Sequence, residues 1–245
     1  MRPALISSAC AAAAFLAFAP CIEAAELDAA THLQDRGWYV SVFAGRSMAE
    51  ELDAAFAGSI VVLGTFNAEA SIAMEDGFLA GAAVGVHANE WARAEVELSV
   101  NRHDVDETVT FDIINVVGAI TAEMEGNIQA LFVLANLWLD FPLGDGIRPY
   151  AGGGVGLGRL KADLDHAIGP LENAFTHDSD WGLACQLGAG VSVDVTPRMA
   201  LDAGYRFKFI RAELELDPNG LLSPSTDTDA DYRSHNIIAG VRWGF

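Results

Sequence analysis

The feature that most constrains the fold of this chain is a strict alternation of apolar and polar residues over 93–101. Ala94, Val96, Leu98 and Val100 alternate there with Arg93, Glu95, Glu97, Ser99 and Asn101. Successive side chains of a β-strand point to opposite faces, so this stretch predicts a strand with one apolar face and one charged face. The charged face must lie where its charges can pair, because an unpaired charge in an apolar environment is very costly.

Alternation of this kind recurs along the chain and is interrupted by turns. We expect strands over 37–45, 77–87, 93–101, 129–141, 148–161, 181–195, 200–210 and 232–245. Short turns follow the second, fourth and sixth of these, and long connections follow the others. An even number of short strands, with tight turns at one end and long loops at the other, is typical of outer-membrane barrels. We therefore predict an all-β fold, an eight-stranded antiparallel transmembrane up-and-down β-barrel with short periplasmic turns and long extracellular loops. A soluble eight-stranded barrel is the alternative fold.

The N-terminus reads as a secretory signal peptide over residues 1–25. Arg2 supplies the positive charge, 4–19 form the apolar segment, and small residues around Ala25 offer cleavage sites. An uncleaved membrane anchor and a lipoprotein modified at Cys21 are the alternatives. We expect residues 26–36 to form a periplasmic N-terminal segment and residues 37–245 to form the barrel domain, in the bacterial outer membrane.

The charge of the chain excludes one large class of partner. Its formal net charge is −20, which argues against nucleic-acid binding. No metal or cofactor is expected either, because the acidic run 227–231 lacks the glycine and the terminal glutamate of a calcium loop. We expect a monomer that contacts outer-membrane lipids and lipopolysaccharide.

The polar faces of the strands predict a filled lumen. The interior of an eight-stranded barrel is just wide enough for side chains, so charges that face inward have to pair with one another. We expect an interior polar network made of Arg93, Glu95, Glu97, Asp202, Arg206, Lys208 and Arg242. This arrangement favours a structural protein without an open pore and without catalytic residues, and a narrow channel is the alternative.

Two further features concern the ends of the strands. Aromatic residues gather there and predict a girdle at the membrane interface. These residues are Trp38, Tyr39, Trp91, Tyr150, Trp243 and Phe245. In the first long loop, 47–50 resembles a capping box, which predicts a short helix continuing to about Phe56.

Four segments resemble the small outer-membrane proteins of proteobacteria, which include the opacity-type surface proteins and the transmembrane domain of outer membrane protein A. They are WYVSVFAG at 38–45, PYAGGGVG at 149–156, GVSVDVTPR at 190–198 and GYRF at 204–207. The resemblance covers essentially the whole chain after residue 25. It implies a role in membrane integrity, adhesion or surface recognition. It also implies that the barrel-assembly machinery reads the C-terminal strand, with Val241, Trp243 and Phe245 as the assembly signal.

An enzyme acting on lipid A is the alternative from another functional class. Deacylases that resemble this fold carry a His and a Ser two positions apart on a late strand. Here the order is Ser234, His235, Asn236, which does not match. Oxidation of lipid A has no motif that can be checked. We therefore expect no enzymatic activity.

Overall fold

The computed structural model describes residues 37–50, 52–60, 64–72, 74–112, 119–143, 146–168, 171–216 and 226–245. The expected signal peptide and N-terminal segment therefore lie outside the described residues. Ten strands occur within them: β1 (Trp38–Ala49), β2 (Leu52–Ile60), β3 (Gly64–Ile72), β4 (Gly77–Asn89), β5 (Ala92–Asp112), β6 (Ala119–Asp140), β7 (Ile147–Ile168), β8 (Leu171–Thr196), β9 (Met199–Leu216) and β10 (Thr226–Gly244). No helix long and apolar enough to cross a membrane occurs in the described part of the chain.

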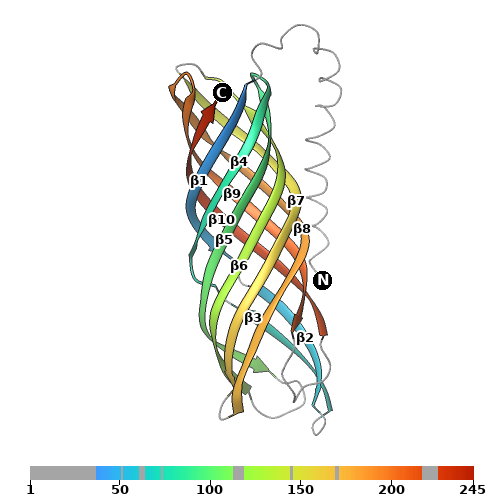
Figure 1. Ribbon diagram of the computed structural model, residues 1–245. Helices are drawn as coiled ribbons and strands as arrows, with labels where there is room; N and C mark the ends of the chain where they lie inside the picture. The colour runs from blue at the N-terminus through green and yellow to red at the C-terminus, as the bar shows by residue number, and fades with distance from the viewer. Residues whose placement is uncertain are drawn as a thin grey trace.

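Eight of these strands form a closed antiparallel barrel in the order β1-β10-β9-β8-β7-β6-β5-β4 (Figure 1). Val42 of β1 closes the ring because it pairs with Val241 of β10 on one side and with Ala82 of β4 on the other. Closure leaves no unpaired edge, as a backbone surrounded by lipid requires. The predicted fold is therefore confirmed.

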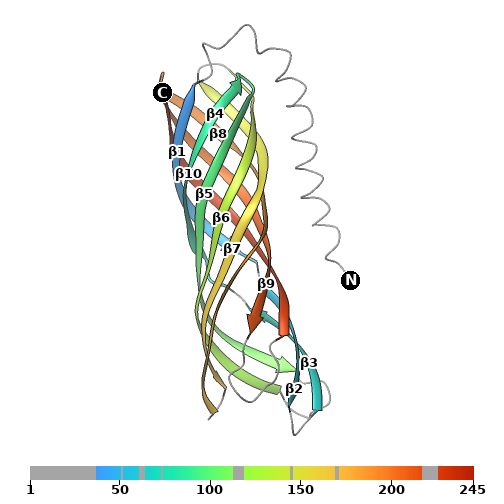
Figure 2. The same cartoon turned by 45° about the vertical axis from the view of Figure 1, so that its right-hand side comes forward.

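The two ends of the barrel differ (Figure 2). One end carries the short turns, such as the Pro197-Arg198 turn between β8 and β9, together with the C-terminus. At the other end the strands run beyond the predicted limits, and β5 stays paired with β6 as far as Asp112 and Ala119. β2 and β3 form a separate antiparallel hairpin at this end.

The predicted alternation places apolar side chains outside and polar ones inside. On β5, Val96 and Leu98 are 60% and 56% exposed, whereas Glu97 between them is fully buried. The outward faces together form an apolar band around the barrel, which suits contact with hydrocarbon. The lumen holds the polar residues of every second position, together with a buried apolar cluster that includes Phe132 and Ile210.

Glycines on the inner faces provide the space for large lumen side chains. A Cβ added to Gly154 of β7 would lie 1.9 Å from Oδ1 of Asn136, and one added to Gly190 of β8 would lie 2.6 Å from the Tyr150 hydroxyl. No side chain fits at such distances without movement of its neighbours. The glycine run of β7 is therefore the complement of the bulky residues that fill the lumen.

Two sequence expectations were wrong. The helix expected over 47–56 is absent: Ser47 and its neighbours continue β1, and β2 begins at Leu52. Strand pairing of 47–49 with β10 satisfies the backbone groups that a helix would otherwise have satisfied. Tyr39 and Tyr150 are also not part of an outer girdle, because they face the lumen and are only 1% and 4% exposed. Trp38, Trp91, Trp243 and Phe245 do lie on the outside of the barrel.

Candidate functional site

The centre of the lumen is organised around Glu97 of β5, which is fully buried. Its Oε1 accepts a hydrogen bond from Lys208 Nζ at 2.5 Å, and its Oε2 accepts one from Arg206 Nη1 at 2.6 Å. Gln186 and Asn136 donate to Oε2 from β8 and β6 at 2.7 and 2.9 Å. Side chains from three other strands, β6, β8 and β9, therefore converge on one carboxylate, which is the arrangement that makes a buried charge tolerable.

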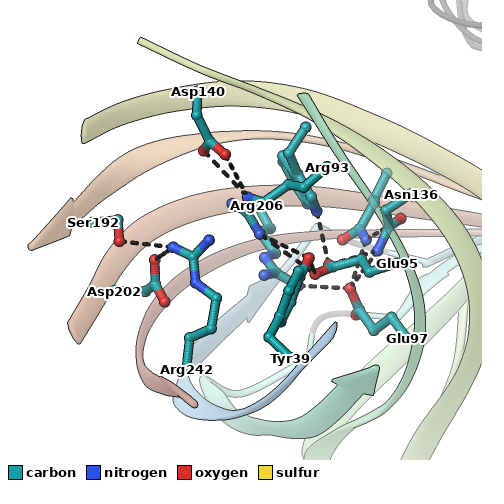
Figure 3. A network of polar contacts seen from close by, with 12 residues as sticks. Tyr39, Arg93, Glu95, Glu97, Asn136, Asp140, Ser192, Asp202, Arg206 and Arg242 are labelled. Carbon is teal, nitrogen blue, oxygen red and sulfur yellow. Dashed lines mark hydrogen bonds and ion pairs between the residues drawn. The ribbon is translucent and has the colours of Figure 1, made fainter. Parts of the chain in front are cut away.

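A second group lies toward the short turns and is centred on Arg93 of β5. Its Nε is 3.1 Å from Asp140 Oδ2, and its Nη1 is 3.5 Å from Glu95 Oε2 (Figure 3). Glu95 also accepts hydrogen bonds from the Tyr39 hydroxyl at 2.9 Å and from Trp138 Nε1 at 2.7 Å. The guanidinium of Arg93 is thus held between two carboxylates.

Aromatic rings enclose the arginines of the lumen. The guanidinium carbon of Arg93 lies 4.9 Å from the centre of the Tyr150 ring, and that of Arg206 lies 4.4 Å from the Phe43 ring. Such contacts are cation–π interactions, and they gain strength where water is excluded. They add packing to the ion pairs and so fix the position of each cation.

The third group joins β10 to β9 and β8. Arg242 Nη2 donates to Asp202 Oδ1 at 2.8 Å and to the Ser192 hydroxyl at 2.7 Å. Arg242 and Ser192 are 4% and 0% exposed. Figure 3 shows this group beside the one around Arg93, with Tyr39 between them.

Taken together, the three groups contain four cations and four anions. The cations are Arg93, Arg206, Lys208 and Arg242, and the anions are Glu95, Glu97, Asp140 and Asp202. A cavity of about 10 Å³ lies near Arg93, Asp202 and Arg206, which is room for about one water molecule. Among the residues that the structure describes, no three His, Cys, Asp or Glu side chains group as they would around a metal ion.

Sequence reasoning missed another polar cluster of the lumen, toward the long loops. His103 Nε2 lies 2.9 Å from the Tyr232 hydroxyl and 3.1 Å from Ser47 Oγ, and its Nδ1 lies 3.0 Å from the carbonyl oxygen of Glu75. Asn101 Nδ2 donates to Ser234 Oγ at 3.0 Å in the same cluster. Strand parity was the signal for these residues. Ser47 and His103 continue the inner faces of their strands beyond the predicted ends, whereas Asn101, Tyr232 and Ser234 lie on inner faces within predicted strands.

Burial shifts the pKa values in this cluster. His103 lies beyond the apolar band, since Arg102 and Asp104 on either side of it point outward and are 48% and 71% exposed. Desolvation lowers the pKa of His103 and outweighs the attraction of Asp76 and Asp104. Desolvation also raises the pKa of Tyr232 to about 12. Both groups are therefore held neutral near pH 7.

All seven residues of the expected interior network lie in the lumen and form ion pairs there. They form three groups instead of one network, and these groups include partners that the sequence did not predict. Asp140 and Tyr39 are such partners of Arg93 and Glu95. The residues of the expected assembly signal lie on the outside near the C-terminus: Val241, Trp243 and Phe245 are 37%, 46% and 73% exposed.

Comparisons with known proteins agree with this geometry. A family model described as "Outer membrane protein beta-barrel domain" matches residues 9–245. An uncharacterized protein of Brucella abortus is 35% identical over 79 residues, which are 30% of this chain and 28% of that protein. An opacity protein of Neisseria gonorrhoeae, opA57, is 27% identical over 128 residues, which are 43% of this chain and 48% of that protein. The matches thus span less than half the length of these relatives.

Two solved structures are similar to this chain over most of its length. Neisserial surface protein A is 20% identical with a TM-score of 0.47, and the alignment covers 85% of this chain and 97% of that one. The outer membrane protein OprG from Pseudomonas aeruginosa is 14% identical with a TM-score of 0.48, and the alignment covers 84% of this chain and 96% of that one.

Proposed function

Because this chain belongs to the outer membrane protein beta-barrel domain family, we propose that it is a structural or surface protein of the bacterial outer membrane whose lumen is closed by its own side chains. Its role is to contribute to envelope integrity or to surface interaction. It acts as a monomer among outer-membrane lipids and lipopolysaccharide, after insertion by the barrel-assembly machinery.

The observation that carries this proposal is the balance of charges in the lumen. Each lumen cation has a carboxylate within 3.5 Å, and Glu97 holds two cations at once. Paired charges of this kind, packed against Trp138 and Phe43, supply polar filling without a water-filled path. A transport pathway would need water or mobile ions where these groups are bonded to one another.

Planar-bilayer recording tests the closed lumen. We expect no stable conductance from the wild-type protein. A variant that removes bulk from the lumen, Trp138→Gly with Arg206→Ala, should conduct and so shows that the assay detects an open barrel of this size. A steady, ion-selective conductance from wild type would replace this proposal with the narrow channel.

One observation favours a second candidate, an enzyme that modifies lipid A. On the outside of the barrel His235 Nδ1 lies 2.5 Å from the Tyr205 hydroxyl, and its Nε2 lies 2.9 Å from Glu50 Oε1. A base between a hydroxyl and a carboxylate is the arrangement of a general-base site. Mass spectrometry of lipid A from a deletion strain decides between the two: unchanged lipid A supports the structural role, and the loss of a modified species supports the enzyme.

A further inference from the structure

The outward face of the barrel ends differently at its two ends. Toward the long loops, five strands pass from apolar outward residues to an outward arginine. These arginines are Arg46 on β1, Arg102 on β5, Arg159 on β7, Arg211 on β9 and Arg233 on β10. At the short-turn end the outward residues include the aromatic side chains of Trp38, Trp91 and Trp243. A chain with a net charge of −20 therefore places five outward arginines at one edge of its apolar band, where Asp76, Asp104 and Asp231 pair with four of them.

Two of these arginines lie side by side and are oriented by one carboxylate. Arg211 Nε is 3.0 Å from Asp231 Oδ1, and Arg233 Nη2 is 3.2 Å from Asp231 Oδ2. Arg211 and Asp231 are paired residues of β9 and β10, so the two guanidinium groups are fixed on neighbouring strands. The Arg233 guanidinium carbon also lies 5.9 Å from the centre of the Phe209 ring.

His235 extends this cationic pair toward the apolar band. Its ring lies between Tyr205 and Glu50, and it is 5.2 Å from the Phe207 ring. Tyr205 is 43% exposed on the outer surface, and Ile237, the next outward residue of β10, is 59% exposed. These side chains form one surface patch, made of Tyr205, Arg211, Arg233 and His235. The arginines of the patch lie on the side of the long loops, and the apolar band begins on its other side.

We propose that this patch binds the phosphate group of a phosphorylated outer-leaflet lipid. A single arginine guanidinium donates two parallel hydrogen bonds to a phosphate, which makes arginine a preferred receptor for that group. The present carboxylate partners leave room for exchange, because the side chains of Arg211 and Arg233 are 41% and 21% exposed, and ion pairs that water reaches contribute less than buried ones. The acyl chains of the same lipid molecule can pack against the adjacent apolar band. This additional contact favours a lipid over free phosphate. The proposal rests on membrane insertion of the proposed surface protein but not on its closed lumen.

Native mass spectrometry of the protein in a neutral detergent tests the site with three probes: bis-phosphorylated lipid A, the same lipid after removal of its phosphates, and inorganic phosphate. We expect the phosphorylated lipid to be retained and the other two not. Arg211→Gln with Arg233→Gln should weaken retention about tenfold or more, which equals about 1.4 kcal/mol. The matched control is Arg198→Gln, an exposed arginine at the short-turn end.

A second variant separates binding from damage to the fold. Asp231→Asn removes the carboxylate that both arginines share and keeps the side-chain volume, while Glu50 stays 3.8 Å from Arg233. It should therefore strengthen retention of the phosphorylated lipid. Weaker retention by this variant overturns the proposal, as does equal retention by the double arginine variant. Retention of the dephosphorylated lipid would mean that acyl chains alone bind, and competition by inorganic phosphate at equal concentration would mean that no lipid is selected. A negative result in this lipid-binding experiment would not affect the planar-bilayer test of the closed lumen.

Discussion

Lys208 Nζ lies 2.5 Å from Glu97 Oε1 in the middle of the lumen, and both side chains are completely buried. Their strands, β9 and β5, lie on opposite sides of the ring, with three strands between them in either direction. The pair therefore connects the two walls of the barrel directly. Arg206 shares the same carboxylate, so Glu97 is the residue on which the central cations depend.

Glu97→Gln should destabilise the barrel strongly. It leaves Lys208 and Arg206 buried without their counter-charge, and breaking a buried pair in this way costs about 3–5 kcal/mol. The measurement is urea unfolding of the refolded protein in lipid vesicles, followed by tryptophan fluorescence. Glu90→Gln, in an exposed turn, is the control and should have little effect.

Removal of Lys208 together with Glu97 should restore part of the lost stability. Glu97→Gln with Lys208→Met leaves one lumen charge fewer of each sign. The double variant should therefore be more stable than Glu97→Gln alone, with a coupling free energy of about 1–3 kcal/mol. Additive losses would show that the two side chains do not interact across the lumen.

A bulky side chain at an inner glycine should prevent closure of the barrel. Gly190→Leu would drive a side chain into Tyr150, whose hydroxyl is 2.6 Å from where the Cβ would stand. We expect loss of the compact, heat-modifiable form on gels. Ala189→Leu, one residue away on the outward face, is the matched control and should fold normally. Normal folding of Gly190→Leu would contradict the packing described for the lumen.

The fold could be predicted from the sequence because its dominant constraint is periodic. Val96 and Glu97 occupy opposite faces on any strand, and eight repeats of that pattern leave few architectures in which the charges can pair. Strand ends were less predictable. β5 continues to Asp112 because its partner β6 continues with it, and pairing at long range is not visible in local composition.

The sequence predicts which side chains face the lumen, but it does not predict which residues they contact there. Parity places Asp140 and Arg93 inside, yet only the stagger of the strands brings Asp140 to the Nε of Arg93. Tyr39 was assigned to the membrane interface because an aromatic residue at a strand end suits it. The hydroxyl of Tyr39 instead bonds Glu95, and a hydrogen bond inside the lumen outweighs the general preference of tyrosine for interfaces.

Acid should weaken the end of the barrel that carries the long loops. Burial lowers the pKa of His103 below its ordinary value of 6.5, so the unfolded chain binds a proton at this residue more readily than the folded one. Stability from the neutral ring is complete above about pH 6.5 and is lost as the pH falls toward the folded pKa. Urea unfolding at a series of pH values measures this loss. His103→Gln should flatten the curve below about pH 6.5, and an unchanged curve would contradict the assignment.

Phe245→Ala should reduce assembly in cells while leaving refolding in vitro nearly unchanged. The side chain is 73% exposed on the outside and contributes little to internal packing. The backbone nitrogen of Phe245, which donates to Trp38 O at 2.9 Å, is not changed by the substitution. A residue that acts as a signal for the barrel-assembly machinery is needed only when that machinery inserts the chain.

The measurements are the amount of heat-modifiable protein in outer-membrane fractions and the yield of refolding into detergent. Phe141→Ala removes another exposed phenylalanine at the short-turn end and should assemble normally. Equal losses in both assays would assign Phe245 to stability, and no loss in either would remove it from the assembly signal.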